Sequence, residues 1–387
     1  MIKKKKLIAG MILVMVMSTV GLINPVLALK NSSIDAATGE KSSLSDSDAI
    51  ISRNLDRYLT VLTDAGRFSG AVQVMRGDTV ILSKGYGMGN YEFSVPNTPQ
   101  TVFPIASNTK QLTAAAILKL QEQGRLNLTD PVTKFIPNAT NWKDIRISHL
   151  LNHTSGIHTD GGFLPTDPES FTLPEIIGMI NTLPLDFEPG TNHTYSNNGY
   201  ITLSYIIEQA SGMPYEEYMK KTFFQPLGMN STGQDNARNV FINRSSGYTT
   251  LGGEQIHYDL MNIHNTYGAG CMHSTVEDLS RWLQAFNTPG VILSPESYKT
   301  MIDNQYGINA HVVQNLTMIW HSGRQFGFVS QTYSIPDDKI SLVYLTNHDR
   351  TPTGTLTKDL VSIVYNKPYT LPGRQSNYLM RGMIRFL

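Results

Sequence analysis

The sequence contains a single cysteine, Cys271, among its 387 residues. No disulfide can form within the chain, so an apolar core has to stabilise it, and we expect Cys271 to be a buried apolar residue. The sequence also lacks net charge, because 31 Lys and Arg balance 31 Asp and Glu. This balance gives no electrostatic reason to expect a nucleic-acid partner. With 40% hydrophobic residues, 31 Gly and 19 Pro, the composition excludes a fibrous or low-complexity chain and predicts a globular protein.

Several common active-site motifs are absent as well. The sequence has no Gly-x-Ser-x-Gly elbow, no His-Glu-x-x-His zinc motif, no Walker loop and no Gly-x-Gly-x-x-Gly before a helix. Its ten histidines are scattered, and even His149, His153 and His158 lack a nearby set of carboxylates or thiols. We therefore expect neither a metal site nor a cofactor.

The N-terminus is unusual in charge and hydropathy. Lys3 to Lys6 precede the apolar residues 7–23, and Ala28 follows with the small residue Val26 two positions before it. This pattern predicts an export signal over residues 1–28. The protein is therefore expected to be secreted or extracytoplasmic, either free or associated with the cell wall or membrane. An uncleaved membrane anchor is the alternative, because the apolar stretch is close to the length that spans a bilayer. Residues 29–47 are polar with little periodicity, which predicts a flexible leader.

Strand patterns occur near both ends of the chain and helical patterns fill the middle. Residues 70–75 and 79–86 alternate around Arg76-Gly77-Asp78, which we interpret as a hairpin turn rather than an adhesion motif. A second hairpin is predicted from 327–335 and 339–346. Helical periodicity covers residues 50–62, 107–123, 145–151, 173–181, 198–209, 215–222, 276–286 and 356–365.

This order predicts an α+β fold in one domain, residues 48–369, followed by a C-terminal tail over 370–387. Residues 66–100 and 305–347 should form one antiparallel sheet flanked by helices, with the mostly helical region 107–300 inserted into it.

The first candidate for chemistry is Ser107-Asn108-Thr109-Lys110, at the start of the helix predicted over 107–123. Three residues are almost one helical turn, so the amine of Lys110 can reach the hydroxyl of Ser107. The pair has the spacing of a nucleophile and its base, and the start of a helix favours developing negative charge. The alternative is an ordinary N-cap serine with a solvent-facing lysine.

Two further short motifs carry suitable groups. In Tyr195-Ser196-Asn197, the phenol of Tyr195 could relay a proton, and the amide of Asn197 could bind both a lysine and a peptide carbonyl. In His321-Ser322-Gly323, a polar or cationic side chain, a hydroxyl and a glycine follow the apolar strand 317–320 and could bind an extended substrate along its edge. Taken alone, each motif is better explained by a structural tyrosine or histidine than by a catalytic one.

Together, Ser-x-x-Lys, Tyr-x-Asn and His-Ser-Gly in this order resemble the penicillin-recognising serine hydrolases. The similar branch contains class C β-lactamases, D-alanyl-D-alanine carboxypeptidases, D-amino-acid peptidases and related esterases. The flanking runs support the resemblance, which extends over about residues 50–365: 103–107 (Phe-Pro-Ile-Ala-Ser), 150–157 (Leu-Leu-Asn-His-Thr-Ser-Gly-Ile), 195–200 (Tyr-Ser-Asn-Asn-Gly-Tyr) and 268–270 (Gly-Ala-Gly). It implies a β-lactamase/transpeptidase-like fold.

The resemblance also implies roles for individual residues. Ser107 matches the acylated nucleophile, Lys110 its base partner, and Tyr195 the group that assists proton transfer. Asn197 matches the amide that orients Lys110 and the substrate, and the His321-Ser322-Gly323 strand binds substrate. The backbone N–H groups of Ser107 and Arg324 would form the oxyanion hole.

Two positions depart from the β-lactamase pattern. His321 stands where β-lactamases of this branch usually carry Lys, which looks more like the carboxypeptidases and D-peptidases. It could read a substrate carboxylate as an imidazolium, or act only as a neutral hydrogen-bonding group. Arg324 is bulkier than the small residue expected there, and its side chain either clamps a carboxylate or turns to solvent.

We therefore expect an exported serine hydrolase that works through an acyl-enzyme on Ser107. The leading prediction is a D-alanyl-D-alanine carboxypeptidase or D-stereospecific peptidase resembling penicillin-binding proteins. The alternatives are a β-lactamase-like esterase, a class C-type β-lactamase, or a β-lactam- or wall-binding protein with little turnover. The expected partner is a small peptide, an ester, a β-lactam or peptidoglycan, with no nucleic acid and no membrane contact except through an uncleaved signal.

Overall fold

The computed structural model describes residues 44–159, 169–235, 239–258 and 262–372. The predicted signal segment, most of the leader and the tail from residue 373 lie outside the described residues. Helix α1 (Asp46–Asp64) begins where the hydroxyl of Ser45 accepts a hydrogen bond from the Asp48 N–H. The helix thus includes the last two residues of the predicted leader, 46 and 47. Among the described residues, no helix is both long and apolar enough to cross a membrane.

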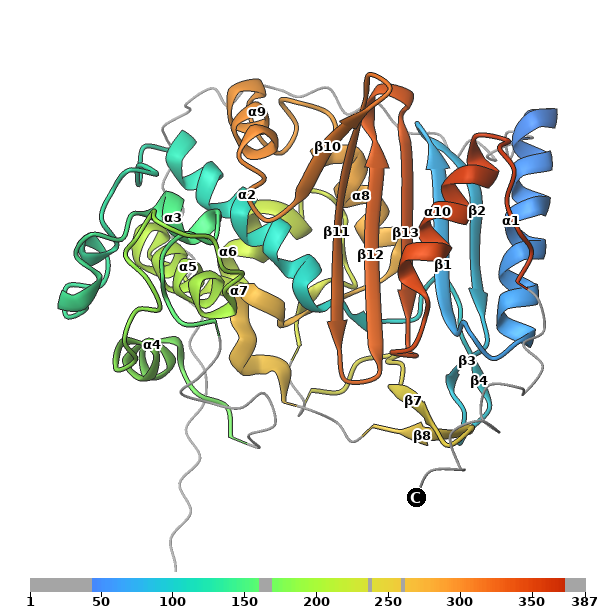
Figure 1. Cartoon of the computed structure of the whole chain (residues 1–387), viewed down its shortest axis with the longest axis horizontal. Coiled ribbons are helices and arrows are strands. Elements are labelled where there is room, and N and C mark those ends of the chain that lie inside the picture. Colours follow the sequence, from blue (N-terminus) through green and yellow to red (C-terminus); the bar gives the residue numbers. More distant parts are fainter. Residues whose placement is uncertain (1–43, 160–168, 236–238, 259–261, 373–387) are drawn as a thin grey trace, which may run out of the picture. The chain divides into compact units, whose positions relative to one another are not determined.

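A six-stranded antiparallel sheet is the centre of the fold, in the order β10-β11-β12-β13-β1-β2 (Figure 1). The N-terminal strands pair with the C-terminal ones where Gly70 of β1 lies opposite Thr346 of β13. The prediction of one sheet built from both ends of the chain is therefore confirmed. Its strands are β1 (Gly70–Arg76), β2 (Thr79–Tyr86), β10 (Asn309–Val313), β11 (Leu316–Gln325), β12 (Phe328–Ile335) and β13 (Ile340–Thr346).

Helices cover both faces of this sheet, which explains why β13 is buried along its whole length and is apolar from Leu342 to Leu345. Leu342 and Tyr344 belong to the core shared with α1 and α10 (Thr353–Val364), whereas Val343 and Leu345 belong to the core on the other face. Successive side chains of a strand point to opposite faces, so burial on both sides needs an unbroken apolar run. Helix α8 (Val276–Phe286) packs on β13 and β1 from that second face.

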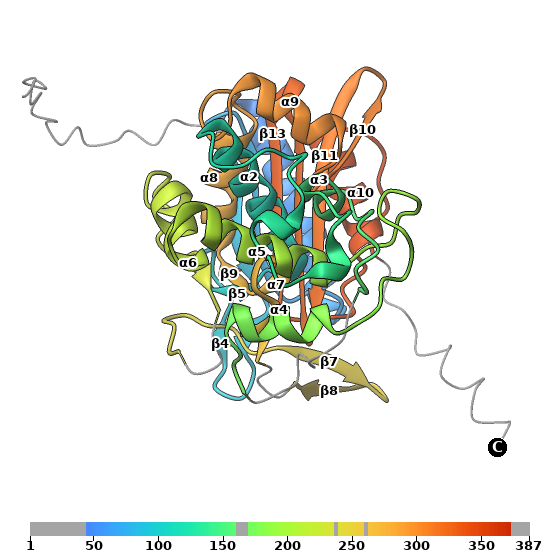
Figure 2. The same ribbon diagram turned by 90° about the vertical axis from the view of Figure 1, so that its left-hand side faces the viewer.

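The inserted region is mostly helical, as predicted, and is built around α2 (Thr109–Glu122). Almost every residue of α2 is buried, and α5 (Asn197–Ser211) packs against it (Figure 2). The other helices are α3 (Ile147–Leu151), α4 (Leu173–Asn181), α6 (Tyr215–Met219), α7 (Tyr267–Gly270) and α9 (Pro295–Asp303). Helices α4 and α8 have the predicted bounds, whereas α7 and α9 had not been predicted.

The short strands were also missed, because two to four residues give too little periodicity to recognise. They form three small sheets: β3 (Met88–Asn90) with β4 (Val95–Pro96), β5 (Phe103–Pro104) with β9 (Met272–Ser274) and β6 (Gly233–Gln234), and β7 (Tyr248–Leu251) with β8 (Glu254–His257).

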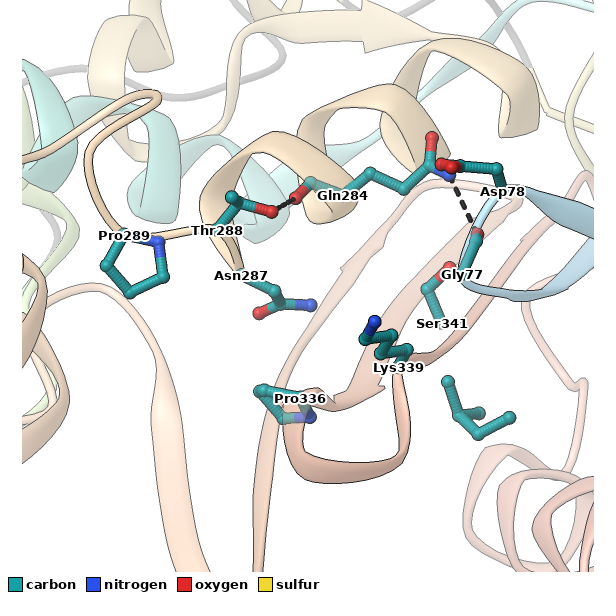
Figure 3. Close-up of a pocket in the computed structure, with 10 residues that line it drawn as sticks. Gly77, Asp78, Gln284, Asn287, Thr288, Pro289, Pro336, Lys339 and Ser341 are labelled. Carbon is teal, nitrogen blue, oxygen red and sulfur yellow. Dashed lines mark hydrogen bonds between the residues drawn. The ribbon is translucent and has the colours of Figure 1, made fainter.

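The Arg-Gly-Asp triplet is the turn between β1 and β2, as its hairpin interpretation predicts. Gly77 has a φ of +56°, the left-handed conformation that favours glycine in such turns. The carbonyl of Gly77 accepts a hydrogen bond of 2.9 Å from the side chain of Gln284 at the end of α8 (Figure 3). The neighbouring cavity of about 410 Å³ lies between this turn, the β12–β13 turn and α8. The triplet thus attaches the hairpin to α8.

Candidate active site

Ser107 lies in the short 3-10 helix Ala106–Asn108 that leads directly into α2. Most of its neighbours in the chain are buried, but Ser107 itself is partly exposed. Ala106 has a φ of +47°, a left-handed conformation that costs a non-glycine residue about 1–2 kcal/mol. Tertiary packing must hold the backbone in this conformation, which is often seen beside catalytic groups. The hydroxyl is therefore presented at the start of a buried helix.

Lys110 is wholly buried and lies one turn further along. Its Nζ donates hydrogen bonds to Ser107 Oγ (3.2 Å), Asn197 Oδ1 (2.8 Å) and the Ala269 carbonyl (2.8 Å). The amide oxygen and the carbonyl can only accept hydrogen bonds. A neutral Lys110 amine would therefore keep its two N–H groups on these oxygens and direct its lone pair at the Ser107 hydroxyl. This is the geometry that a general base requires.

Tyr195 is placed by the N-cap of α5. The hydroxyl of Ser196 accepts the Gly199 N–H at 3.0 Å, which fixes the residues on either side of it. Tyr195 then donates its phenolic O–H to Ser107 Oγ at 2.9 Å, and its ring lies over Lys110 Nζ at 4.7 Å. Asn197, on the other side of the cap, reaches Lys110. The structure thus brings Ser107, Lys110, Tyr195 and Asn197 into one hydrogen-bonded group.

Strand β11 closes the other side of this group. A Cβ atom on Gly323 would lie 2.2 Å from the Ile105 carbonyl oxygen and 2.9 Å from the Ser107 nitrogen, so only glycine fits there. Ser330, which pairs with Gly323 on β12, donates from its hydroxyl to the same Ile105 carbonyl at 2.5 Å. The backbone of β11 therefore lies directly against that of Ser107. An oxyanion hole made by the N–H groups of Ser107 and Arg324 stays a prediction that fits this contact.

The structure does not bring two of the expected side chains to Ser107. The side chain of Ser322 points to the opposite face of the sheet, where it lines a separate cavity with Trp320 and Gln331. The exposed side chain of Arg324 donates a hydrogen bond to the backbone carbonyl of Asp349. Of the two orientations considered for Arg324, the structure thus shows the one turned away from the site. A substrate would meet only the backbone of these two residues.

His321 is buried beside the group and is electrically neutral. Burial, and secondarily the charge of Lys110, lower the pKa of His321 to about 4, although a hydrogen bond to the Ser322 carbonyl opposes the shift. That carbonyl, 2.8 Å away, can only accept, so Nδ1 carries the proton and Nε2 is left as an acceptor. Near neutral pH the side chain therefore offers a lone pair, which suits an N–H group and disfavours a carboxylate.

His153 was not predicted to contribute to the site. Its ring lies 4.6 Å from the ring of Tyr195, and its Nδ1 accepts the Ser196 N–H at 3.1 Å. Burial and the charge of Lys110 lower its pKa to about 3. With Tyr195, His193 and His321 it lines a cavity of about 460 Å³. Its place in the 150–157 run was visible in the sequence, but its contact with Tyr195 was not.

A buried polar network that sequence reasoning also missed joins the start of α2 to β12. The amide of Asn108 donates to Ser330 Oγ at 2.7 Å and accepts from the hydroxyl of Thr332 at 2.8 Å. Gln111 donates to both Asn108 and Thr332. Because buried polar groups are costly to separate, this network holds the nucleophile segment against the sheet. In the part of the chain that the structure describes, no three His, Cys, Asp or Glu side chains gather as metal ligands.

A serine hydroxyl contacted by a buried lysine and a phenol, at the start of a helix beside an antiparallel sheet, defines a serine hydrolase. Comparison with known families agrees, because the model of the family described as Beta-lactamase matches residues 52–365. The chain therefore belongs to the β-lactamase family, which includes penicillin-binding protein homologues.

Individual relatives support this assignment. The chain is 31% identical to PbpX of Bacillus subtilis (strain 168), over 63% of this chain and 62% of PbpX, so less than two thirds of that protein is matched. It is 28% identical to penicillin-binding protein 4* of the same strain, over 84% of this chain and 78% of that protein. Among solved structures, the octameric penicillin-binding protein homologue from Pyrococcus abyssi superposes with a TM-score of 0.71 at 26% identity. That match covers 81% of this chain and 77% of the other.

Proposed function

We propose that the protein is an exported D-stereospecific serine peptidase that acts on peptides without a free carboxylate at the leaving end. The observation that carries this proposal is the neutral, acceptor-bearing side chain of His321. A carboxypeptidase needs a positive charge for the C-terminal carboxylate. Lys110 is buried in the nucleophile group, and Arg324 is turned toward Asp349. Between the two activities expected from the sequence, this geometry favours the peptidase.

The proposed reaction is acyl transfer to Ser107. Its Oγ attacks the substrate carbonyl while Lys110, directly or through Tyr195, takes the hydroxyl proton. The tetrahedral oxyanion is stabilised by backbone N–H groups, each worth about 3–4 kcal/mol. Tyr195, which contacts Oγ at 2.9 Å from the exposed side, then protonates the leaving amine as the C–N bond breaks, and the proton held by Lys110 passes back to the Tyr195 oxygen. In the second step water attacks the ester carbonyl, its hydroxyl group joins the acyl group, and its other proton goes to Ser107 Oγ through the same groups, which regenerates Ser107.

Preference for D-residues and export are the less direct parts of the proposal. The D-preference is supported by the Tyr-x-Asn and His-Ser-Gly motifs and by the penicillin-binding names of two relatives. Export is supported by residues 1–28, which have the charge and hydropathy of a signal. Cleavage of an ester by the same residues is the second candidate. The Nε2 lone pair of His321 favours a substrate that carries an N–H group, and therefore an amide.

The test uses protein beginning at residue 29 and four substrates: a D-Ala-D-Ala peptide, its C-terminal amide, the L-Ala-L-Ala amide and a chromogenic cephalosporin. We expect the D-Ala-D-Ala amide to have the highest kcat/KM, and Ser107→Ala to lose both hydrolysis and labelling by a fluorescent penicillin. Preference for the free acid would show a carboxypeptidase, and faster cleavage of the cephalosporin a β-lactamase. Labelling that persists in Ser107→Ala would rule out this nucleophile.

A further inference from the structure

We propose that the face of the sheet opposite Ser107 carries a second ligand site, which binds an acidic sugar. Helix α10 crosses β13 and β1 and leaves part of β11 and β12 uncovered beside it (Figure 1). A cavity of about 650 Å³ lies there, between β11, β12 and α10. This volume is within the range of about 300–1,000 Å³ that is common for small-molecule sites. The nucleophile group does not line this cavity, so the inference goes beyond the proposed peptidase.

The floor of the cavity carries one accessible aromatic platform, the indole ring of Trp320. Trp320 of β11 lies directly opposite Tyr333 of β12, and both side chains line the cavity. Trp320 is partly exposed, whereas Tyr333 is only 9% exposed and its hydroxyl donates to Met318 Sδ, so the indole is the ring that an occupant would contact. Such rings are apolar on the face and polar at the edge. A sugar ring matches them, because it has a C–H face and a rim of hydroxyl groups.

Polar groups beside the platform suit the rim of such a ring. Gln331 is only 5% exposed, and its Nε2 donates to the carbonyls of His321 at 3.0 Å and Thr332 at 2.9 Å. Its orientation is thereby fixed, and within the described residues its Oε1 accepts no hydrogen bond, so it can receive one from an occupant. The hydroxyl of Ser322, next to Gln331 across the strands, adds a donor and acceptor.

The charge of the cavity selects an anion. Lys358 of α10 lies at the rim and is exposed, and none of the described residues that line the cavity is acidic. A carboxylate on the sugar would therefore meet a positive charge and no repulsion. N-acetylmuramic acid has this chemistry, whereas N-acetylglucosamine has the same ring without the carboxyl-bearing ether. The two sugars form a matched pair for the test.

The chain provides its own reporter of binding. Of its three tryptophans, Trp142 and Trp282 are 1% and 0% exposed and belong to the core on the other side of the sheet. Trp320 is only partly buried and lines the cavity. Titration with N-acetylmuramic acid should give a saturable change in tryptophan fluorescence, and N-acetylglucosamine should bind about three- to fivefold more weakly. Trp320→Phe should remove the signal.

Charge and location are tested by two further variants. Lys358→Gln should bring the affinity for the acidic sugar down to that for the neutral one, whereas Lys299→Gln, a matched exposed lysine that pairs with Asp303, should change nothing. Ser107→Ala should bind the sugar with unchanged affinity, because Ser107 does not line this cavity. Sugar binding and peptide hydrolysis are therefore measured independently, and either proposal can fail while the other holds. The proposal is overturned if neither sugar gives a saturable change, if both bind equally well, or if Ser107→Ala loses the response.

Discussion

The neutral state of His321 leads to a prediction about substrate charge and pH. With a pKa of about 4, only about one molecule in a thousand carries an imidazolium at pH 7. If the site does not use that charge, kcat/KM for a free-acid peptide and for its C-terminal amide should follow the same pH profile. Their ratio should then stay within about twofold from pH 5.5 to 8.5, because only the shared acyl-transfer groups titrate.

A histidine with its ordinary pKa gives a very different result. If an imidazolium of pKa about 6.5 bound the carboxylate, its population would fall about 90-fold over the same pH range, and the ratio of acid to amide would fall with it. Replacement of His321 by lysine supplies the missing charge. We expect His321→Lys to raise the acid-to-amide ratio about ten- to a hundredfold, the scale of one hydrogen bond to a charged group.

The assay is initial-rate hydrolysis of the matched acid and amide across this pH range, in the wild type, His321→Lys and His321→Asn. The asparagine variant is the control, because it is polar but uncharged, and it should keep the flat ratio of the wild type. A wild-type ratio that falls steeply between pH 5.5 and 8.5, and flattens in His321→Asn, would refute the reasoning. It would also restore the carboxypeptidase prediction.

Four other predictions follow from the same geometry. Lys110→Ala and Tyr195→Phe should each lower acylation about 100-fold, and a double mutant as defective as the product of the two singles would contradict a shared proton path. Gly323→Ala should prevent labelling by fluorescent penicillin, because the added Cβ would collide with the carbonyl oxygen of Ile105, two residues before Ser107. Normal labelling of this variant would show that β11 can move away from that carbonyl. His153→Phe, which keeps a ring on Tyr195 but loses the acceptor for the Ser196 N–H, should lower kcat about tenfold with little change in KM; an equal rise in KM would argue against a positioning role. Because the folded pKa of His321 lies below its unfolded value of about 6.5, its contribution to stability is complete above that pH and is lost as pH falls toward 4, by up to about 3 kcal/mol. Thermal melts at about pH 6.5 and pH 4 should show a smaller loss of stability in His321→Asn than in the wild type. An equal loss in the two proteins would show that other groups cause the acid sensitivity.

The sequence by itself determined the parts of the site that depend on local geometry. A helix has 3.6 residues per turn, so Ser107 and Lys110 had to share a face once their segment was helical. The alternating hydrophobic patterns of the two hairpins likewise predicted strands near both ends of the chain. Because the residues between them have helical patterns, the two hairpins were expected to pair with each other in one sheet. The approach of Tyr195 and Asn197 to Lys110 was expected only through resemblance to a family, because no local rule relates residues that lie 87 positions apart.

Only the tertiary structure decided how the β11 strand is used. Alternation along a strand is certain, but which face meets the helices depends on packing, so Ser322 turned away from the site while His321 and Gly323 turned toward it. The pKa of His321 depends on burial by distant segments and on the charge of Lys110, neither of which is visible in a strand of ten residues. The contact of His153 with Tyr195 and the network from Asn108 to Ser330, 222 positions away, arise for the same reason. Desolvation and long-range contacts are properties of the assembled fold, and they set the charge state of this site.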